Sequence, residues 1–306
     1  MPESKQHNRL FCFGYGYSCE YLARALKSRG WEIAGTTRDP EKKKAMRTAG
    51  IETYMFSGDA SLVDARQFLE GTTHLLVSTP PDDQGDPAFR HHGDDVLGID
   101  GLRWVGYLSS TAVYGDREGG WVDEESELRP NSKRGSRRAK AEGQWLSLYK
   151  DEELPVHVFR LAGIYGPGRS ALDAVRAGVS RRIDKPGHAF SRVHIDDIVQ
   201  VLLASMEKPN PGRIYNVCDD EAAPSHKLIA LACEMLALPV PALIPYEQAD
   251  LAPMTRSFYS DNKRVKNDRI KQELGIKLMH PDFRSGLEAC LAQESSAPVG
   301  AYTGEV

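Results

Sequence analysis

The sequence predicts an α/β protein with a doubly wound parallel sheet and a smaller C-terminal lobe. Two patterns support this prediction. Short apolar runs, typical of parallel strands buried on both faces, alternate along the chain with stretches of helical periodicity. The first such unit, residues 9–40, has the order strand, glycine turn, helix, strand. Because connections between parallel strands are right-handed, successive units predict a sheet covered by helices on both faces.

Residues 9–40 form the clearest unit. Residues 10–13 are an apolar run, and a turn containing Gly14 and Gly16 follows at once. Positions 19, 22, 23 and 26 then form an apolar stripe at helical spacing. Gly30 suits the end of that helix, and residues 31–36 are predicted as the second strand. This order is typical of the start of a Rossmann-type fold.

The glycine turn predicts a dinucleotide site. Glycine lets the backbone approach a pyrophosphate, and the N–H groups of Tyr17 and Ser18, which open the helix, offer it partial positive charge. Cys19 replaces the third glycine of G-x-G-x-x-G, where a small residue serves close helix packing. A glycine turn without a nucleotide is the alternative. Because the glycine turn lies between a strand and an amphipathic helix, the sequence favours a turn that binds a nucleotide.

The end of the second strand predicts which dinucleotide binds. An NAD site usually has Asp or Glu about 20 residues past the glycines, where it bonds the ribose 2′-hydroxyl. Thr37 and Arg38 hold that place here, and a hydroxyl beside a guanidinium suits a 2′-phosphate. Asp39 could take the acidic role if the strand ends one residue later. We therefore expect NADP(H) to be preferred over NAD(H).

Composition excludes several classes of function. Lys plus Arg total 39 against 43 Asp plus Glu, so the net charge is −4 and no nucleic-acid or membrane partner is expected. Five scattered cysteines without C-x-x-C spacing are typical of buried thiols in a reducing compartment. No apolar run approaches the roughly 18 residues of a membrane span. We expect a cytoplasmic protein without a metal site.

The following strands place more polar residues at one edge of the sheet. Predicted strands 51–56, 73–77 and 104–108 are each followed by polar residues. Ligands of doubly wound sheets bind outside the carboxyl ends of the strands. The residues expected there with the glycine turn are Asp59, Ser78, Thr79, Pro80 and Ser110. By contrast, residues 82–101 are too polar and broken to predict a helix.

The later part of the chain predicts the smaller lobe. Helices are expected over 171–179, 196–208, 225–238, 262–274 and 281–292, and a last strand over 213–217. We assign the sheet domain to 9–165 plus about 192–218, and the lobe to about 166–191 plus 219–293. Residues 294–306 are predicted as a disordered tail.

Several ordered segments resemble one family. They are the glycine turn, YLSSTAVYGD at 107–116, VDEESELRP at 122–130, FRLAGIYGPGR at 159–169, RVHIDDIVQVLLASME at 192–207, YNVCDD at 215–220 and DNKRVKNDRIKQELG at 261–275. Together they resemble an extended or atypical short-chain dehydrogenase/reductase of the NAD-dependent epimerase/dehydratase type. The resemblance covers about residues 9 to 293.

The resemblance also implies site residues. Ser110, four residues before the tyrosine of VYG, would bond the reacting oxygen of the substrate. The family's Tyr-x-x-x-Lys pair, in which the lysine lowers the tyrosine pKa, would fall at Arg134 and Arg138. A guanidinium has no acceptor and a pKa above ~12, so Arg134 cannot exchange a proton near neutral pH. It could instead clamp a carboxylate or phosphate or neutralise an oxyanion, while Arg138 could bond the ribose.

Alternatives stay open at this point. KRGSRRAK at 133–140 could be only a solvated basic face or a nucleic-acid patch. Tyr114, Tyr165 and His194 are candidate proton donors, although Tyr114 also suits a core or rim aromatic and His194 a structural role. The first functional hypothesis is an NADP-dependent oxidoreductase or epimerase/dehydratase acting on a small polar molecule, sugar-like or anionic. The second is a non-catalytic NADP(H)-binding regulator or sensor. We expect a monomer or weak homodimer.

Overall fold

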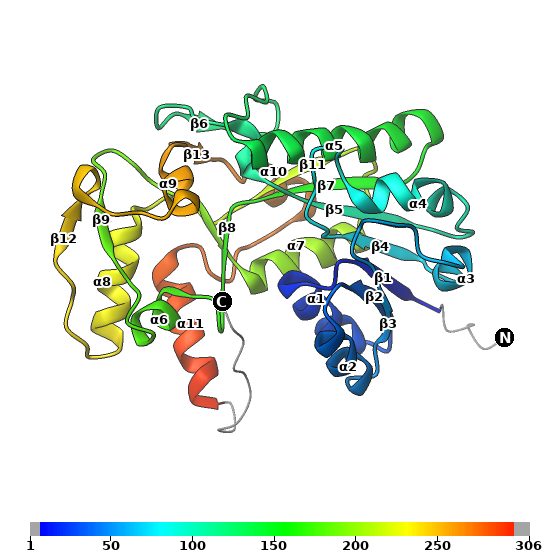
Figure 1. Ribbon diagram of the computed structural model, residues 1–306, viewed down its shortest axis with the longest axis horizontal. Coiled ribbons are helices and arrows are strands. Elements are labelled where there is room, and N and C mark those ends of the chain that lie inside the picture. Colours follow the sequence, from blue (N-terminus) through cyan, green and yellow to red (C-terminus); the bar gives the residue numbers. More distant parts are fainter. Residues whose placement is uncertain (1–6, 297–306) are drawn as a thin grey trace.

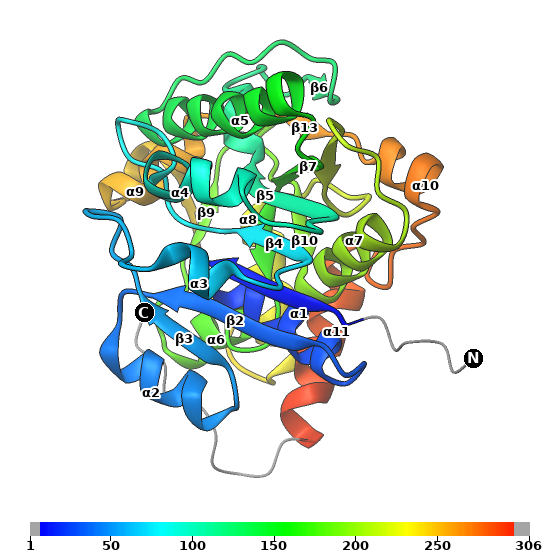
Figure 2. The same cartoon turned by 90° about the vertical axis from the view of Figure 1, so that its right-hand side faces the viewer.

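The computed structural model describes residues 7–296, and its centre is a seven-stranded parallel sheet (Figure 1). The strands are β1 (Arg9–Phe13), β2 (Glu32–Thr37), β3 (Glu52–Met55), β4 (His74–Val77), β5 (Trp104–Ser110), β7 (Val156–Leu161) and β11 (Ile214–Val217). Their spatial order is β11-β7-β5-β4-β1-β2-β3, and β3, β2, β1 and β4 can be followed side by side in Figure 2. The chain returns past β1 to add β4, which makes the sheet doubly wound, as the sequence predicts.

Helices cover both faces of the sheet. They are α1 (Tyr17–Lys27), α2 (Pro40–Thr48), α3 (Ala65–Leu69), α4 (Pro87–Leu97), α5 (Lys133–Glu152), α7 (Ile195–Glu207) and α10 (Asp268–Leu274). In Figure 1, α4 and α5 lie above the sheet, and α1 and α7 lie below it. The two sides of β1 belong to two separate clusters of core residues: Leu10 and Cys12 pack on one face, Phe11 and Phe13 on the other. A strand buried on both faces explains the uninterrupted apolar run.

The helix α4 corrects the expectation for residues 82–101. The Asp86 carboxylate accepts hydrogen bonds from Ala88 N at 2.8 Å and Phe89 N at 3.1 Å, which caps the start of the helix. Pro87 follows at the first helical position, where proline is favourable. Ala88, His92 and Val96 form its buried stripe at i, i+4 spacing. Two of these three residues are small or polar, so the stripe carries little hydrophobic signal in the sequence.

A smaller lobe stands at one end of the sheet. It includes α6 (Ala171–Arg176), α8 (Ser225–Met235), α9 (Pro253–Tyr259) and α11 (Phe283–Ser296), together with the strand pair β9 (Arg182–Asp184) and β12 (Leu243–Pro245). α6, α8 and α11 share a core of their own. Two further strand pairs join distant segments: β8 (Gly163–Tyr165) with β10 (Arg192–His194), and β6 (Trp121–Val122) with β13 (Arg264–Val265).

The two largest errors in the boundaries of the predicted helices lie near the C-terminus. The helix expected over 262–274 begins only at Asp268, because Arg264 and Val265 form β13. The helix α11 continues to Ser296, so residues 294–296 are helical rather than part of a disordered tail, and the rest of that segment lies outside the described residues. Within residues 7–296, no helix is both long enough and apolar enough to cross a bilayer.

Candidate functional site

The glycine turn after β1 packs against the end of β4. Gly14 N donates to Thr36 Oγ1 at 2.8 Å, and Tyr15 N donates to the Thr36 carbonyl at 2.7 Å. Gly14 has a φ of +80°, and a Cβ on it would lie 3.0 Å from Thr79 N. Both conformation and space therefore favour glycine at this position. Gly14 and Gly16 each keep part of their surface open to solvent, so protein side chains do not plug the turn.

The N-terminus of α1 fits a diphosphate. Gly16 precedes the helix and gives it no side-chain cap, whereas Asp39 caps α2. The first N–H groups of the helix, from Tyr17 and Ser18, are therefore left for an anion, which the helix dipole also favours. The Ser78 side chain is close, since a Cβ on Gly16 would lie 3.8 Å from Ser78 Oγ. The turn and the helix start thus fit the group that the fold implies.

The side chains around this helix start have defined roles. Cys19, in place of a third glycine, is fully buried, and its sulfur donates to the Gly14 carbonyl at 3.3 Å. The hydroxyl of Tyr17 donates to the Pro167 carbonyl at 3.0 Å, and its ring lies 5.7 Å from the Arg169 guanidinium. The side chain of Tyr17 therefore ties α1 to the turn at 166–169, and only its backbone is left for a nucleotide.

The strand β2 ends at Thr37, one residue beyond the predicted strand. Thr37 is the last residue of the strand and is buried, while the Arg38 side chain is exposed. Asp39 accepts from Glu41 N at 2.9 Å and Lys42 N at 3.3 Å, which caps α2. The Asp39 carboxylate is therefore already used to cap α2.

The other residues predicted at this edge differ in exposure. Asp59 follows β3 in an exposed bend, and Pro80 is exposed after β4. Thr79 is buried, and its hydroxyl donates to the Asp86 carboxylate at 3.0 Å. Burial raises the pKa of Asp86 to about 6. Because β3 and β4 are parallel members of one sheet, both segments leave it at the edge that carries the glycine turn.

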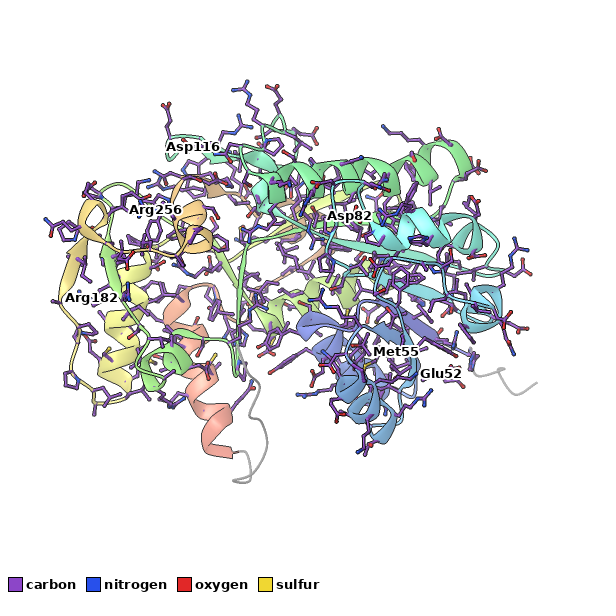
Figure 3. The ribbon with its side chains drawn as sticks, viewed as in Figure 1. Glu52, Met55, Asp82, Asp116, Arg182 and Arg256 are labelled. Carbon is purple, nitrogen blue, oxygen red and sulfur yellow. The ribbon has the colours of Figure 1, made fainter. Side chains whose placement is uncertain are left out.

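A large cleft opens beside the ends of β5 and β7. Its volume is about 1430 Å³, and it is lined by Ser110, Arg134, Arg138, the strand pair β8–β10 and the segment 250–265. Figure 3 labels Arg256, which lies on α9 within this segment, and Asp116, which lies in the loop before β6. The structure thus brings together three of the four predicted catalytic residues. The glycine turn is not among the lining residues.

Ser110 and Arg138 occupy the wall of this cleft. Ser110 ends β5, is partly exposed, and accepts from Ala112 N at 3.2 Å through Oγ, which leaves its hydroxyl proton free to be donated. The Arg138 guanidinium donates to the Leu108 carbonyl at 2.7 Å and to Tyr107 Oη at 3.2 Å. Part of the donor set of Arg138 is therefore used within the protein.

Arg134 lies one turn before Arg138 on α5 and makes a different contact. Its guanidinium stacks 4.3 Å from the ring centroid of Phe258 on α9. Burial, and then the positive charge of Arg138, lower the pKa of Arg134 from its usual value. It remains a cation near neutral pH. That Arg134 and Arg138 stand in for a tyrosine and lysine stays a prediction.

The structure contradicts the expectation that Tyr114 is a catalytic residue. Tyr114 is completely buried, and its hydroxyl donates to Asn216 Oδ1 at 2.7 Å and accepts from Arg160 at 2.9 Å. Arg160 in turn pairs with the buried Glu142 at 2.8 Å. Burial raises the pKa of Tyr114 to about 12. The tyrosine therefore belongs to a buried polar network and does not line the cleft.

The other two candidate proton donors are also engaged. Tyr165 lines the cleft, but burial raises its pKa, and its hydroxyl lies 3.4 Å from the Asp282 carbonyl. His194 is completely buried, and burial lowers its pKa to about 4. Its Nδ1 accepts from Asp196 N at 3.2 Å, and His280 Nε2 lies 3.3 Å from Asp196 Oδ2. The ligand atoms of His194, Asp196 and His280 lie close enough to share an ion, but His194 Nδ1 already caps the start of α7.

Sequence reasoning missed Lys263 and Asp261, which line the cleft. Lys263 Nζ lies 3.3 Å from Asp261 Oδ2, and the lysine side chain is 10% exposed. Burial lowers the pKa of Lys263 from its usual value. The polar run DNKR at 261–264 was a signal for a surface turn, but the helix predicted over 262–274 concealed it.

Comparisons with known proteins agree with this geometry. The model of the NAD dependent epimerase/dehydratase family matches residues 95–218. A functionally unknown conserved protein from Silicibacter pomeroyi, of solved structure, is 50% identical, with a TM-score of 0.86 and coverage of 94% of this chain and 99% of that one. Protein YeeZ of Escherichia coli K12 is 28% identical over 88% of this chain and 95% of its own length.

More distant structures share the fold. A UDP-glucuronic acid 4-epimerase from Bacillus cereus, solved in complex with NAD, has a TM-score of 0.72 at 16% identity, with coverage of 94% of this chain and 99% of that one. Three observations agree: the parallel sheet, the open glycine turn, and the family match, which runs from the end of α4 to β11. Residues 95–218 of the chain belong to the NAD-dependent epimerase/dehydratase family.

Proposed function

We propose that this protein binds NADP(H) and acts as an oxidoreductase or epimerase/dehydratase on a small polar substrate in the cleft beside Ser110. One observation carries the proposal. Two features lie at the carboxyl ends of strands in one sheet. One is the uncapped start of α1 after the glycine turn, and the other is the cleft lined by Ser110, Arg134 and Arg138. The point where strand order reverses, between β1 and β4, is the usual ligand site of such sheets.

The preference for NADP(H) is supported by the end of β2. A 2′-hydroxyl site needs a free acid there, but the Asp39 carboxylate caps α2. Arg38 is exposed and can present its donors to a 2′-phosphate. A charge-assisted hydrogen bond of this kind contributes about 1.5–3 kcal/mol. We expect Arg38→Ala to weaken NADPH binding by about tenfold to a hundredfold and to leave NADH binding unchanged.

The residues of the cleft would divide the chemistry between them. The nicotinamide supplies or accepts a hydride when it is bound. Ser110 would donate its hydroxyl proton in a hydrogen bond to the reacting oxygen, and Arg134 would stabilise negative charge near it. Since a guanidinium does not exchange protons near neutral pH, the factor of about 10²–10⁴ that general acid–base catalysis contributes must come from another group.

A second candidate function is an NADP(H)-binding regulatory protein without turnover. The observation that favours it is the state of the proton donors named from the sequence: the Tyr114 hydroxyl is buried in a network, and His194 caps a helix. On either proposal the ligands are small molecules, no nucleic acid or membrane takes part, and the protein is a monomer or weak homodimer.

Two measurements separate the candidates. Titration with NADPH and with NADH, followed by nicotinamide fluorescence, tests the cofactor, and tighter NADH binding rejects the NADP(H) assignment. A screen of sugars, nucleotide sugars and carbonyl compounds, followed by nicotinamide absorbance, then tests turnover with Ser110→Ala as the comparison. Turnover that Ser110→Ala abolishes supports the enzyme. Tight NADPH binding without turnover supports the regulator, and turnover unchanged by Ser110→Ala removes the role of Ser110.

A further inference from the structure

Arg134 has donors that the protein does not use. Within residues 7–296 its guanidinium contacts the face of Phe258 and makes no hydrogen bond or ion pair with the protein. Stacking on a ring occupies one face of the guanidinium and leaves the N–H groups at its edge free. Those N–H groups can bind an oxyanion through two parallel hydrogen bonds.

The neighbouring charges leave Arg134 without a counter-ion. Arg138 is a second cation on the same face of α5, and its field lowers the pKa of Arg134. The carboxylate of Asp261 is also near enough to act on Arg134, but it pairs with Lys263 at 3.3 Å. This corner of the cleft therefore holds three cations and one carboxylate. A bound anion would relieve that imbalance.

The imbalance extends through the whole cleft. Seven Lys and Arg side chains line it against two Asp carboxylates, although the chain as a whole has a net charge of −4. A cleft lined by charge of one sign raises the local concentration of ligands of the opposite sign. The cleft is thus positive in a protein that is acidic overall.

Other cations of the cleft have protein partners. Arg138 donates to the Leu108 carbonyl. Arg192 is 8% exposed and donates to the carbonyls of Phe190 and Ala223. Lys263 has Asp261. Unlike these three described cations, Arg134 makes no hydrogen bond or ion pair with the described protein, so its whole donor set remains available to a ligand.

We propose that Arg134 binds an anionic group of the substrate, a carboxylate or a phosphate, at the corner of the cleft closed by Phe258. This inference rests on the proposed function, because it names the substrate class of the same cleft. In the register predicted from the sequence, Arg134 takes the place of the family's tyrosine. The proposed role there is therefore to bind and orient a charged group, with no proton transferred.

The test uses inorganic phosphate and malonate as separate probes. Each is titrated by calorimetry into wild-type protein saturated with NADPH, so that the nucleotide's own phosphate sites are already filled. Arg134→Gln is compared with Arg137→Gln, which removes the same charge from the same helix but from a side chain that pairs with Asp83 outside the cleft. We expect Arg134→Gln to weaken binding of at least one probe by about tenfold to a hundredfold. Arg137→Gln should change it less than twofold.

The outcomes are distinguishable. Loss of phosphate binding alone assigns a phosphate, and loss of malonate binding alone assigns a carboxylate. Equal effects of the two variants, or no binding of either probe to the NADPH-saturated wild type, overturn the inference and leave the cofactor proposal intact. Failure of NADPH to bind overturns the proposed function instead, and the same titrations on the free protein then test Arg134 alone. Unchanged NADPH affinity in Arg134→Gln shows that the variant is folded.

Discussion

The conformation of Gly14 allows a sharp test of the nucleotide turn. Gly14 and Gly30 both have positive φ, +80° and +81°, so alanine at either position meets the same backbone strain. That strain costs about 1–2 kcal/mol. A Cβ on Gly30 meets nothing within 4 Å, whereas a Cβ on Gly14 would lie 3.0 to 3.3 Å from backbone atoms of Ser78 and Thr79. Gly30→Ala is therefore a matched control for conformation without crowding.

Crowding against backbone should add about 1–3 kcal/mol to the loss of stability in Gly14→Ala. It should also push the end of β4 away from the turn and disturb the N–H groups at the start of α1. Urea unfolding of both variants measures the free energy of unfolding, and NADPH titration measures the site. We expect Gly30→Ala to keep wild-type NADPH affinity and Gly14→Ala to lose at least tenfold. Equal stability losses with equal NADPH affinity would refute the reasoning.

Three further predictions concern the buried groups. Tyr114→Phe removes the hydroxyl that Arg160 and Asn216 share, so it should lower the free energy of unfolding by about 1–3 kcal/mol and leave NADPH affinity unchanged, as measured by urea unfolding and titration. Glu142→Gln leaves the buried Arg160 without its counter-ion and should cost about 3–5 kcal/mol in the same unfolding assay; a loss below about 1 kcal/mol would contradict the pair's role. Acid should destabilise the fold. Burial lowers the pKa of four histidines to about 4, namely His74, His157, His188 and His194. The unfolded chain binds these protons below about pH 6.5 and the folded chain does not, so stability present above that pH is lost as pH falls toward 4, by up to about 1.4 kcal/mol per pH unit for each histidine. Urea unfolding between pH 7 and 4.5 that shows no decline would contradict this.

The sheet and the nucleotide turn could be predicted because their signals are local. A strand, two glycines and an amphipathic helix lie within residues 9–40, and the structure has these elements there. The position of Thr37 at the end of β2 follows from the same short unit. The helix α4 was missed because its buried stripe includes His92 and Ala88, which carry little hydrophobic signal.

The cleft was harder to predict because it depends on contacts between distant segments. The hydroxyl of Tyr114 forms hydrogen bonds with Arg160 and Asn216, and no local sequence pattern indicates that these three residues are in contact. Lys263 enters the cleft because the strand that follows it, β13, pairs with β6 from the other half of the chain. A helical pattern over 262–274 could not reveal that pairing.

The most direct test of the account is a crystal structure of the protein grown with NADPH. We predict density for the diphosphate against the N–H groups of Tyr17 and Ser18, the 2′-phosphate beside Arg38, and the nicotinamide pointing to the cleft at Ser110. A structure at saturating NADPH with no nucleotide density at the glycine turn would contradict the central claim.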